Sequence, residues 1–345
     1  MPTSYGLKFK IQFSLSAFKL YHRFQLLTSL HTNAKLNYDK ILRGIFMKMY
    51  ANLHTHSTHS DGVFTPEEMV IIAKKEGYKA IAITDHDTAT AYPYLKAECD
   101  KEDMECIFGV EFSVQEPGDF HIIGFNFDPE YPEMKKYLED MAIRQTDNTK
   151  KCFDLAVEKG NISGVTWNEV LEFNKTVKWL CNNHVFNTMK AKGLVKQSEY
   201  RAWFDLNYGD NRFIFPPSIK FKTLYEIINL IKAAGGFAVW AHPCCTASGL
   251  EHFEMMLEAG IEGIEVWHHS ASDEKRREIY DLAIKHGLFI SGGSDHSGLC
   301  GGYYDSYPTK EAMMASYHYI PELSTGTTEE HFREIQSGRI SRRRR

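Results

Sequence analysis

The sequence predicts an α/β protein built around a mostly parallel sheet or barrel. Short apolar runs rich in β-branched and aromatic residues alternate with helical patterns over most of the chain. Such alternation is typical of βα units. The 345 residues, 43% of them apolar, suffice for one large domain with an insertion. Histidines and acidic residues recur directly after the apolar runs, which suggests that one edge of the sheet carries a site.

The strand and helix patterns begin near residue 50. The expected strands are residues 50–54, 79–84, 106–113, 121–127, 237–241, 263–267 and 288–292. The expected helices between and after them are residues 65–76, 223–234, 250–259, 273–286 and 328–337. The first helix shows the reasoning: Thr65 is an N-cap residue, Pro66 fits the first turn together with acids, and Gly77 ends the helix.

The alternation is interrupted between residues 131 and 211. This stretch contains only helical patterns, at residues 133–159, 166–174, 184–192 and 198–204. We therefore expect an inserted helical subdomain at residues 131–211. The segments 49–130 and 212–340 on either side of it are expected to form the main domain together.

Both ends of the chain are basic. Residues 1–46 contain seven Lys or Arg and one acid, and the segment 341–345 ends in four arginines, so the rest of the chain has a net charge near −15. The tail is expected to be a solvated terminus. Residues 1–48 are interpreted as a basic extension, disordered or translated from an upstream start, because Met47 and Met49 precede the first strand. A transit-like presequence and an ordered accessory element are the alternatives.

The composition limits the kinds of molecule that this protein is expected to bind. A strongly acidic body disfavours a stable complex with long nucleic acid and favours a small anionic substrate. A run of about 18 uncharged apolar residues is absent from the sequence, so we expect no membrane partner. The seven cysteines form no CxxC pair, which indicates a reduced, cytoplasmic protein. The composition leaves the oligomeric state open.

The most informative residues follow the expected strands. His54 and His56 are two residues apart on a strand, so both side chains project from one face. Each imidazole offers a neutral nitrogen to a metal, and Asp61 follows in the next turn. Other strand ends supply His86, Glu111, His242, Asp295 and His296. In βα barrels the carboxyl ends of the strands converge at one mouth, so we expect these side chains to meet there.

These donors predict a divalent-metal site for hydrolysis. Imidazole mixed with carboxylate, without cysteine, suits Mn²⁺, Fe²⁺ or Zn²⁺. Glu111 is the candidate to bridge ions ~3.5–4 Å apart. Such ions would activate water to hydroxide and neutralise charge on the leaving oxygen. The sequence contains neither a nucleophile-elbow serine motif nor a P-loop.

The runs LHTHSTHSDG, TDHDT, GVEFS, FHIIGF, AGGFAVWAHP and GGSDHSG resemble the PHP (polymerase and histidinol phosphatase) superfamily, and within it the free-standing metal-dependent phosphoesterases. The resemblance covers about residues 50–128 and 220–340. It implies a distorted seven-stranded, TIM-like βα barrel with two or three divalent ions, Mn first, with Zn or Fe as alternatives. The implied metal ligands are His54, His56, Asp61, His86, Glu111, His121, His242, Asp295 and His296. The family usually places the last histidine two residues after the aspartate, where this chain has Ser297.

The branch with a helical insert implies the activity. It removes phosphate from nucleoside 3′,5′-bisphosphates and trims short 5′-phosphorylated RNA, with Glu111, His242 and Asp295 as the implied catalytic residues. An Arg-x-His step near the phosphate is replaced here by Asn182-Asn183-His184. His184 is therefore a candidate for binding substrate, as are the insert cations Arg144 and Lys178, for which ordinary surface charge is the alternative.

Several assignments keep an alternative. A histidinol-phosphate phosphatase and a non-catalytic metal-binding regulatory module remain as other functions. The exact substrate, phosphatase or exonuclease action, and the identity and number of the metal ions stay open. His121 opens its strand and so has a structural alternative. Asp85 and Asp87 are expected to orient His86 or bind water, and His268 is expected at the rim. Trp203 is expected in the core, with base stacking as its alternative.

Overall fold

The computed structural model describes residues 49–115, 117–207, 219–244, 249–297 and 325–340. The basic extension 1–48 and the arginine tail 341–345 lie outside these residues, so the interpretations made of them stay predictions. The proposed subdomain boundaries also stay predictions.

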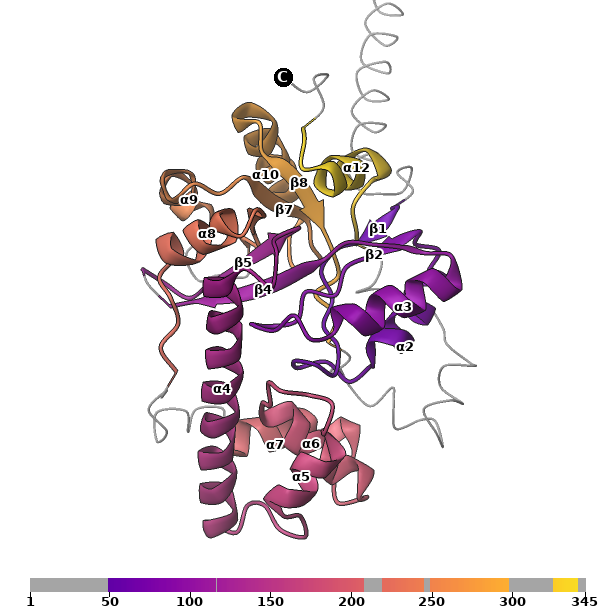
Figure 1. Cartoon of the computed structure of the whole chain (residues 1–345), viewed down its shortest axis with the longest axis vertical. Helices are drawn as coiled ribbons and strands as arrows, with labels where there is room; N and C mark the ends of the chain where they lie inside the picture. Colours follow the sequence, from indigo (N-terminus) through magenta and orange to yellow (C-terminus); the bar gives the residue numbers. More distant parts are fainter. Residues whose placement is uncertain (1–48, 116, 208–218, 245–248, 298–324, 341–345) are drawn as a thin grey trace, which may run out of the picture. The chain divides into compact units, whose positions relative to one another are not determined.

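The described strands form two open sheets (Figure 1). The three-stranded sheet consists of β1 (Ala51–Asn52), β2 (Ala80–Ile81) and β3 (Glu105–Cys106), all parallel and in that order. The five-stranded sheet consists of β4 (Gly109–Val114), β5 (Phe120–Phe125), β6 (Phe237–Trp240), β7 (Gly263–Trp267) and β8 (Phe289–Gly292). In it β5 runs antiparallel to β4 and β6, whereas β6, β7 and β8 are parallel.

The α/β class and the largely parallel pairing are confirmed, but a closed seven-stranded barrel is not. Neither sheet closes on itself. Isolated bridges join the two sheets instead: Thr55 pairs with His296, and His86 pairs with Glu111. The first bridge includes His296, and the second joins His86 to Glu111, so each contains a predicted metal ligand. The sheets therefore meet where the site is.

Helices cover the sheets, and α2 shows how local start signals in the sequence fix where a helix begins. They are α2 (Pro66–Lys75), α3 (Tyr92–Glu102), α8 (Leu224–Ala233), α9 (Phe253–Ala259), α10 (Asp273–His286) and α12 (Glu329–Ser337). In α2 the Thr65 hydroxyl accepts from the Glu68 amide while the Glu68 carboxylate accepts from the Thr65 amide, a complete capping box. Helix α3 was not expected. Its N-cap, Ala91, makes no side-chain hydrogen bond and its first turn has no acid, so Pro93 in the first turn is the start signal that remains.

Two apolar clusters form the core of the main body. One packs α2 and α3 on β2, with Met69, Leu95 and Ile81 at its centre. The other fills the space among the strands, with Phe125 and Val239 fully buried. Burial on this scale fixes the strands rigidly, and the side chains at their ends inherit that rigidity.

The inserted helices have a core of their own. Helices α5 (Trp167–Phe173), α6 (Asn182–Ala191) and α7 (Tyr200–Asn207) group beside the lower half of the long α4 (Pro132–Glu158), as Figure 1 shows. Phe153, Val170, Phe186 and Trp203 pack together inside this group. Trp203 therefore lies in a core, as expected from the sequence.

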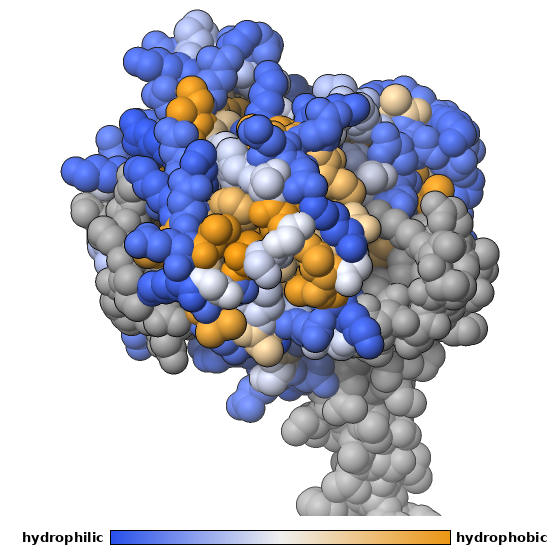
Figure 2. Space-filling view, turned by 90° about the horizontal axis from the view of Figure 1, so that it is seen from below, coloured by the Kyte–Doolittle hydropathy of each residue, from blue (hydrophilic) through white to orange (hydrophobic). Residues whose placement is uncertain are grey.

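Apolar side chains also reach the surface of the insert. Figure 2 looks at the molecule from below and shows apolar side chains gathered near the middle of that face. Large exposed apolar residues of the insert are Ile143, Val157, Leu171, Phe173, Leu194 and Leu206. Among the helices in the described part of the chain, none is both long and apolar enough to span a bilayer.

Candidate metal centre

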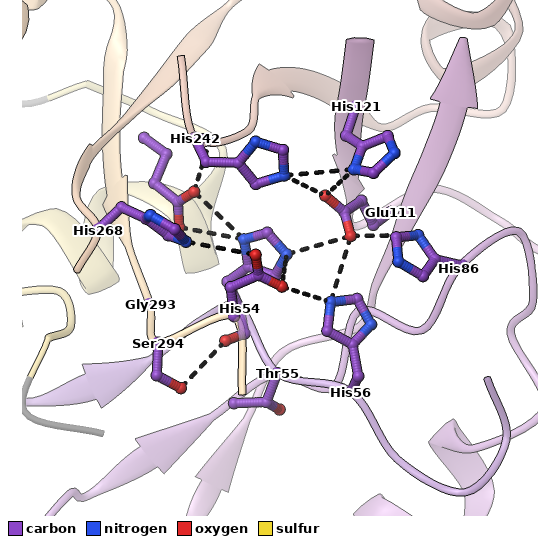
Figure 3. Close-up of polar contacts among 12 residues, drawn as sticks. His54, Thr55, His56, His86, Glu111, His121, His242, His268, Gly293 and Ser294 are labelled. Carbon is purple, nitrogen blue, oxygen red and sulfur yellow. Dashed lines mark hydrogen bonds and ion pairs between the residues drawn. The ribbon is translucent and has the colours of Figure 1, made fainter. Parts of the chain in front are cut away.

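Glu111 lies at the centre of a ring of histidines (Figure 3). Its Oε2 is 3.2 Å from His54 Nε2, 3.3 Å from His56 Nε2 and 3.3 Å from His86 Nδ1. Its Oε1 is 3.0 Å from His121 Nδ1 and 3.0 Å from His242 Nε2. The carboxylate is fully buried. Its two oxygens thus face two separate groups of imidazoles, which is the arrangement of a bridging ligand.

The donors divide into three overlapping groups among the described residues, and in each group the ligand atoms lie within 4.8 Å of one another. His54, His56, Glu111 and Asp295 form the first. His56, Asp61 and His86 form the second, and His86, Glu111 and His121 form the third. The structure therefore brings together eight of the nine predicted ligands, since His242 joins through its contact with Glu111.

Glu265, on β7, orients two of these ligands and was not singled out from the sequence. Its oxygens are both 3.2 Å from His54 Nδ1, and its Oε2 accepts from the His242 amide at 2.8 Å. A hydrogen bond from Nδ1–H to this carboxylate directs the lone pair of His54 Nε2 toward Glu111. A charged residue within the apolar run Gly263–Trp267 was the signal that could have revealed it.

His268 is another orienting residue, more deeply buried than the expected rim position. Its Nδ1 accepts from the Ser270 amide at 3.2 Å, so the proton of the neutral ring lies on Nε2. That Nε2 faces Asp295 Oδ2 at 3.4 Å, while Asp295 Oδ1 is 2.9 Å from His56 Nε2. His268 thus binds the outer oxygen of Asp295 and leaves the inner oxygen for the cluster.

The backbone is strained where it delivers ligands. His242 has φ of 29° and Asp295 has φ of 51°, a region that non-glycine residues rarely adopt. Gly293 brings β8 close to the first strand, because a Cβ there would lie 2.4 Å from the His54 amide nitrogen. Larger residues would push Asp295 away from the histidines.

His296 does not join any of the three groups. The left-handed turn at Asp295 is followed by the bridge to Thr55, and the His296 carbonyl accepts from the His56 amide at 3.0 Å. The His296 ring stacks on Phe64 with centroids 5.9 Å apart. Burial lowers the pKa of His296 to about 4. Its assignment as a ligand stays a prediction.

The loop 57–62, which carries Asp61, is held tightly. Asp85 accepts from the Ser57 amide at 2.7 Å, from the Ser57 hydroxyl at 2.6 Å and from the Ser60 hydroxyl at 2.5 Å. At Gly62 a Cβ would lie 2.4 Å from the His56 carbonyl oxygen, so only glycine fits. Asp85 therefore shapes this loop, a role different from orienting His86. Asp87 accepts from the Ser113 amide, and burial raises its pKa to about 7.

The predicted substrate-binding residues make other contacts. His184 accepts from the Cys181 amide at Nδ1 (2.9 Å), and its Nε2 lies 3.0 Å from the Thr58 carbonyl oxygen. Arg144 donates to the Lys220 carbonyl at 3.3 Å. The Lys178 carbonyl accepts from Thr146. Binding of substrate by His184, Arg144 and Lys178 stays a prediction.

The donor set fits divalent cations. Four atoms of the cluster are buried and have no hydrogen-bond partner among the described residues: Glu111 Oε2, His54 Nε2, His56 Nδ1 and His86 Nδ1. Two such lone-pair atoms 3.2 Å apart repel each other unless a cation lies between them, either a proton or a metal ion. Unpaired oxygen and nitrogen atoms from one carboxylate and several imidazoles are the ligands that Mn²⁺, Fe²⁺ and Zn²⁺ accept.

The charges of the cluster are strongly coupled. Burial disfavours charge on His54, but Glu111, Glu265 and Asp295 outweigh burial and raise its pKa well above the usual value. Burial likewise opposes charge on Glu111, yet His54, His121 and His86 lower its pKa. Burial lowers the pKa of His86 to about 4, so this imidazole stays neutral and able to bind a metal at physiological pH.

Comparison with known proteins places this site in a family. Residues 52–198 match the PHP domain. The chain is 30% identical over 261 residues to the 5′-3′ exoribonuclease Rnm of Salmonella typhimurium, covering 72% of this chain and 85% of that protein. This chain belongs to the PHP family. It is a metal-dependent phosphoesterase of that family.

Two further proteins are similar to this chain, one in sequence and one in fold. The 3′,5′-nucleoside bisphosphate phosphatase of Chromobacterium violaceum is 28% identical over 255 residues, 71% of this chain and 86% of that protein. A Bifidobacterium adolescentis structure described as a metal-dependent phosphoesterase superposes with a TM-score of 0.67 at 23% identity. The superposition covers 86% of this chain and 99% of the Bifidobacterium chain, which supports the assignment of the fold.

Proposed function

We propose that this PHP protein hydrolyses phosphate esters of nucleotides, either a nucleoside 3′,5′-bisphosphate or short 5′-phosphorylated RNA. The observation that supports hydrolysis most directly is Glu111, whose two oxygens face two groups of imidazoles. The nucleotide class rests on relatives named an exoribonuclease and a nucleoside bisphosphate phosphatase. A cytoplasmic location and a small phosphorylated partner are part of the same proposal.

The residues of the chain have distinct tasks in this proposal. His54, His56, Glu111 and Asp295 would hold one cation, and Glu111, His121 and His242 a second. Asp61 with His86 would hold a third. When bound, divalent cations supply the Lewis acidity that activates water and neutralises the charge on the leaving oxygen.

The remaining tasks are orientation and access. Glu265 fixes the His54 ring and the His242 backbone, and His268 fixes Asp295. The His121 side chain is 36% exposed, that of Asp295 is 28% exposed and that of Glu111 is fully buried. Substrate phosphate would therefore approach past His121 and Asp295, with Glu111 at the base of the site.

The test compares substrates on one preparation. Mn²⁺-loaded protein is given adenosine 3′,5′-bisphosphate, a 5′-phosphorylated trinucleotide RNA and histidinol phosphate, and released phosphate and nucleotides are measured. Preference for either of the first two supports the proposal, and their ratio separates phosphatase from exonuclease action. Preference for histidinol phosphate overturns the nucleotide assignment. Absence of turnover with Mn²⁺, Zn²⁺ and Fe²⁺ would favour the non-catalytic regulatory module.

A further inference from the structure

The first turn of α6 contacts the loop that carries Asp61. Three residues of the insert each bind one carbonyl oxygen of this loop. Asn183 Nδ2 donates to the Asp61 carbonyl at 2.6 Å, His184 Nε2 lies 3.0 Å from the Thr58 carbonyl, and the Cys181 thiol lies 3.5 Å from the Ser60 carbonyl. We call Cys181, Asn183 and His184 the α6 clamp, and residues 57–62 the Asp61 loop.

The three residues of the clamp are buried, and their contacts determine which nitrogen of His184 carries the proton. Asn183, His184 and Cys181 are each at most 3% exposed. Because His184 Nδ1 accepts from the Cys181 amide, the ring proton lies on Nε2 and is donated to Thr58. Burial keeps this ring neutral by lowering the pKa of His184 to about 4. Both nitrogens of the His184 ring therefore bind backbone groups, one the Cys181 amide and the other the Thr58 carbonyl.

A further residue sets the direction of the Asn183 amide. The Tyr200 hydroxyl donates to Asn183 Oδ1 at 2.5 Å, so Nδ2 has to face the Asp61 carbonyl. Tyr200 belongs to α7 and its ring packs edge-on against Phe186 in the core of the insert. The core of the insert is thereby connected, through Tyr200 and Asn183, to the backbone of a predicted metal ligand.

Asp61 depends on its loop for its position. Its carboxylate is 28% exposed, and its Oδ1 lies 3.4 Å from His56 Nδ1 and 3.3 Å from the Ser60 hydroxyl, both long contacts. Asp85 binds the loop from the inner side through Ser57 and Ser60. The clamp binds it from the outer side at residues 58, 60 and 61. Backbone hydrogen bonds from Thr58 to Phe64 and from Val63 to Ser297 also hold the two ends of the loop. The clamp adds the contact to the carbonyl of Asp61 itself, so its loss would loosen the loop at the residue that carries the carboxylate.

We propose that Asn183 and His184 are positioning residues that hold Asp61 in the metal cluster, so that the folded insert sets the affinity of one cation. This inference rests on the proposed metal site and adds a structural reason for the insert. It also assigns His184 a task other than contact with substrate. The insert would therefore act mainly on metal binding rather than on substrate binding.

The test measures Mn²⁺ binding directly. Purified full-length protein is equilibrated with increasing Mn²⁺ alone, and bound ions per chain are counted by elemental analysis. Asn183→Ala is expected to weaken one ion of the set about 10- to 100-fold, the range known for residues that orient ligands. Asn187→Ala, one turn further along the same helix, is the matched control and should leave the isotherm unchanged.

Kinetics separate positioning from substrate binding. If the clamp positions Asp61, kcat of Asn183→Ala and of His184→Ala should recover at high Mn²⁺ with KM for the nucleotide unchanged. An unchanged Mn²⁺ isotherm together with a raised KM would overturn the proposal and restore His184 to substrate binding. Because the isotherm needs no turnover, failure of the nucleotide assignment would leave this test intact.

Two further variants distinguish the proposed loss of positioning from misfolding of the insert. Tyr200→Phe removes only the hydroxyl that orients Asn183 and should weaken the same ion by a smaller factor with an unchanged melting temperature. In an Asp61→Asn background, Asn183→Ala should have no additional effect on the isotherm, because both changes act on one ion. Additive effects of the two substitutions would contradict the proposed coupling.

Discussion

Two glutamates on successive strands show how the surroundings decide the task of a carboxylate. Glu111 on β4 is fully buried among five imidazoles. Glu105, the first residue of β3, is 37% exposed at its side chain and binds both terminal nitrogens of Arg333 on α12. Glu111 is the third residue of β4 and Glu105 the first residue of β3, so the side chains around each carboxylate, rather than its place along the strand, separate the two tasks.

The cause of the difference is hydration. Within the described part of the chain, the charged partners of the buried Glu111 are imidazoles rather than Lys or Arg, so protons or metal ions on the histidines have to balance its charge. Glu105 keeps part of its hydration and has a permanent cation beside it. Arg333 is the first cause, and Tyr50 a smaller one, of the drop in the pKa of Glu105 to about 2. The comparison shows that a cluster which cannot balance its own charge is a site for added cations.

The largest effect is expected at Glu111. Glu111→Gln keeps the shape but removes the charge that both groups of imidazoles share, so turnover should fall by at least about 10³-fold. Bound Mn²⁺ per chain, counted by elemental analysis, should fall as well. Glu105→Gln is the matched control and should leave both quantities within about twofold. Equal losses in the two variants would break the comparison.

A smaller effect is expected at His268, whose Nε2 faces Asp295 Oδ2 and whose ring lies beside those of His54 and His242. His268→Leu should lower Mn²⁺ affinity and kcat by about 10- to 100-fold, because the outer oxygen of Asp295 loses its donor. His268→Gln can place an amide nitrogen near the position of Nε2 and should recover most of the affinity. If the glutamine variant were as impaired as the leucine variant, an orienting hydrogen bond would be the wrong explanation.

The smallest effect is expected at the ion pair of Glu105 with Arg333. The pKa of Glu105 is about 2 in the folded protein against an ordinary value of 4.5, so its ion pair stabilises the fold fully above pH 4.5 and loses this contribution as the pH falls toward 2. Because the pair is partly exposed, Arg333→Gln should lower the free energy of unfolding by only about 0.5 kcal/mol at pH 7.

Urea unfolding at several pH values checks this expectation. The difference between the parent protein and Arg333→Gln should shrink steadily between pH 4.5 and pH 2. Arg201→Gln, in an exposed ion pair of α7 with Asp205, serves as a control. A difference that grew toward low pH would have the wrong sign for a lowered pKa.

Local signals predicted much of the fold. Thr65 with Glu68 and Thr223 with Glu226 form the capping boxes that start α2 and α8, and these contacts lie within one turn of chain. Helix α3 was missed because Ala91 offers no cap. The antiparallel pairing of β5 with β6 was also beyond the sequence, because the insert separates these two strands in the chain.

The site was predictable wherever a ligand type followed a strand. His54, His56, His86 and Asp295 have both signals, Glu111 lies within β4, and the structure brings all five together. Residues that act on other residues were harder to find. Glu265 lies inside an apolar strand and Asn183 inside a helix, while His268 follows a strand but acts through Asp295, and the partners of all three lie far away in the sequence.

The sequence by itself determined which side chains could hold cations, because donor type and the period of a strand are local properties. Only the tertiary structure decided that Glu111 stands between two groups of histidines, that the His296 ring stacks on Phe64, and that the insert grips the Asp61 loop. Those outcomes depend on strained turns at Asp295 and His242 and on hydrogen bonds between distant segments. Such contacts contribute to the free energy of folding only after the distant segments have come together.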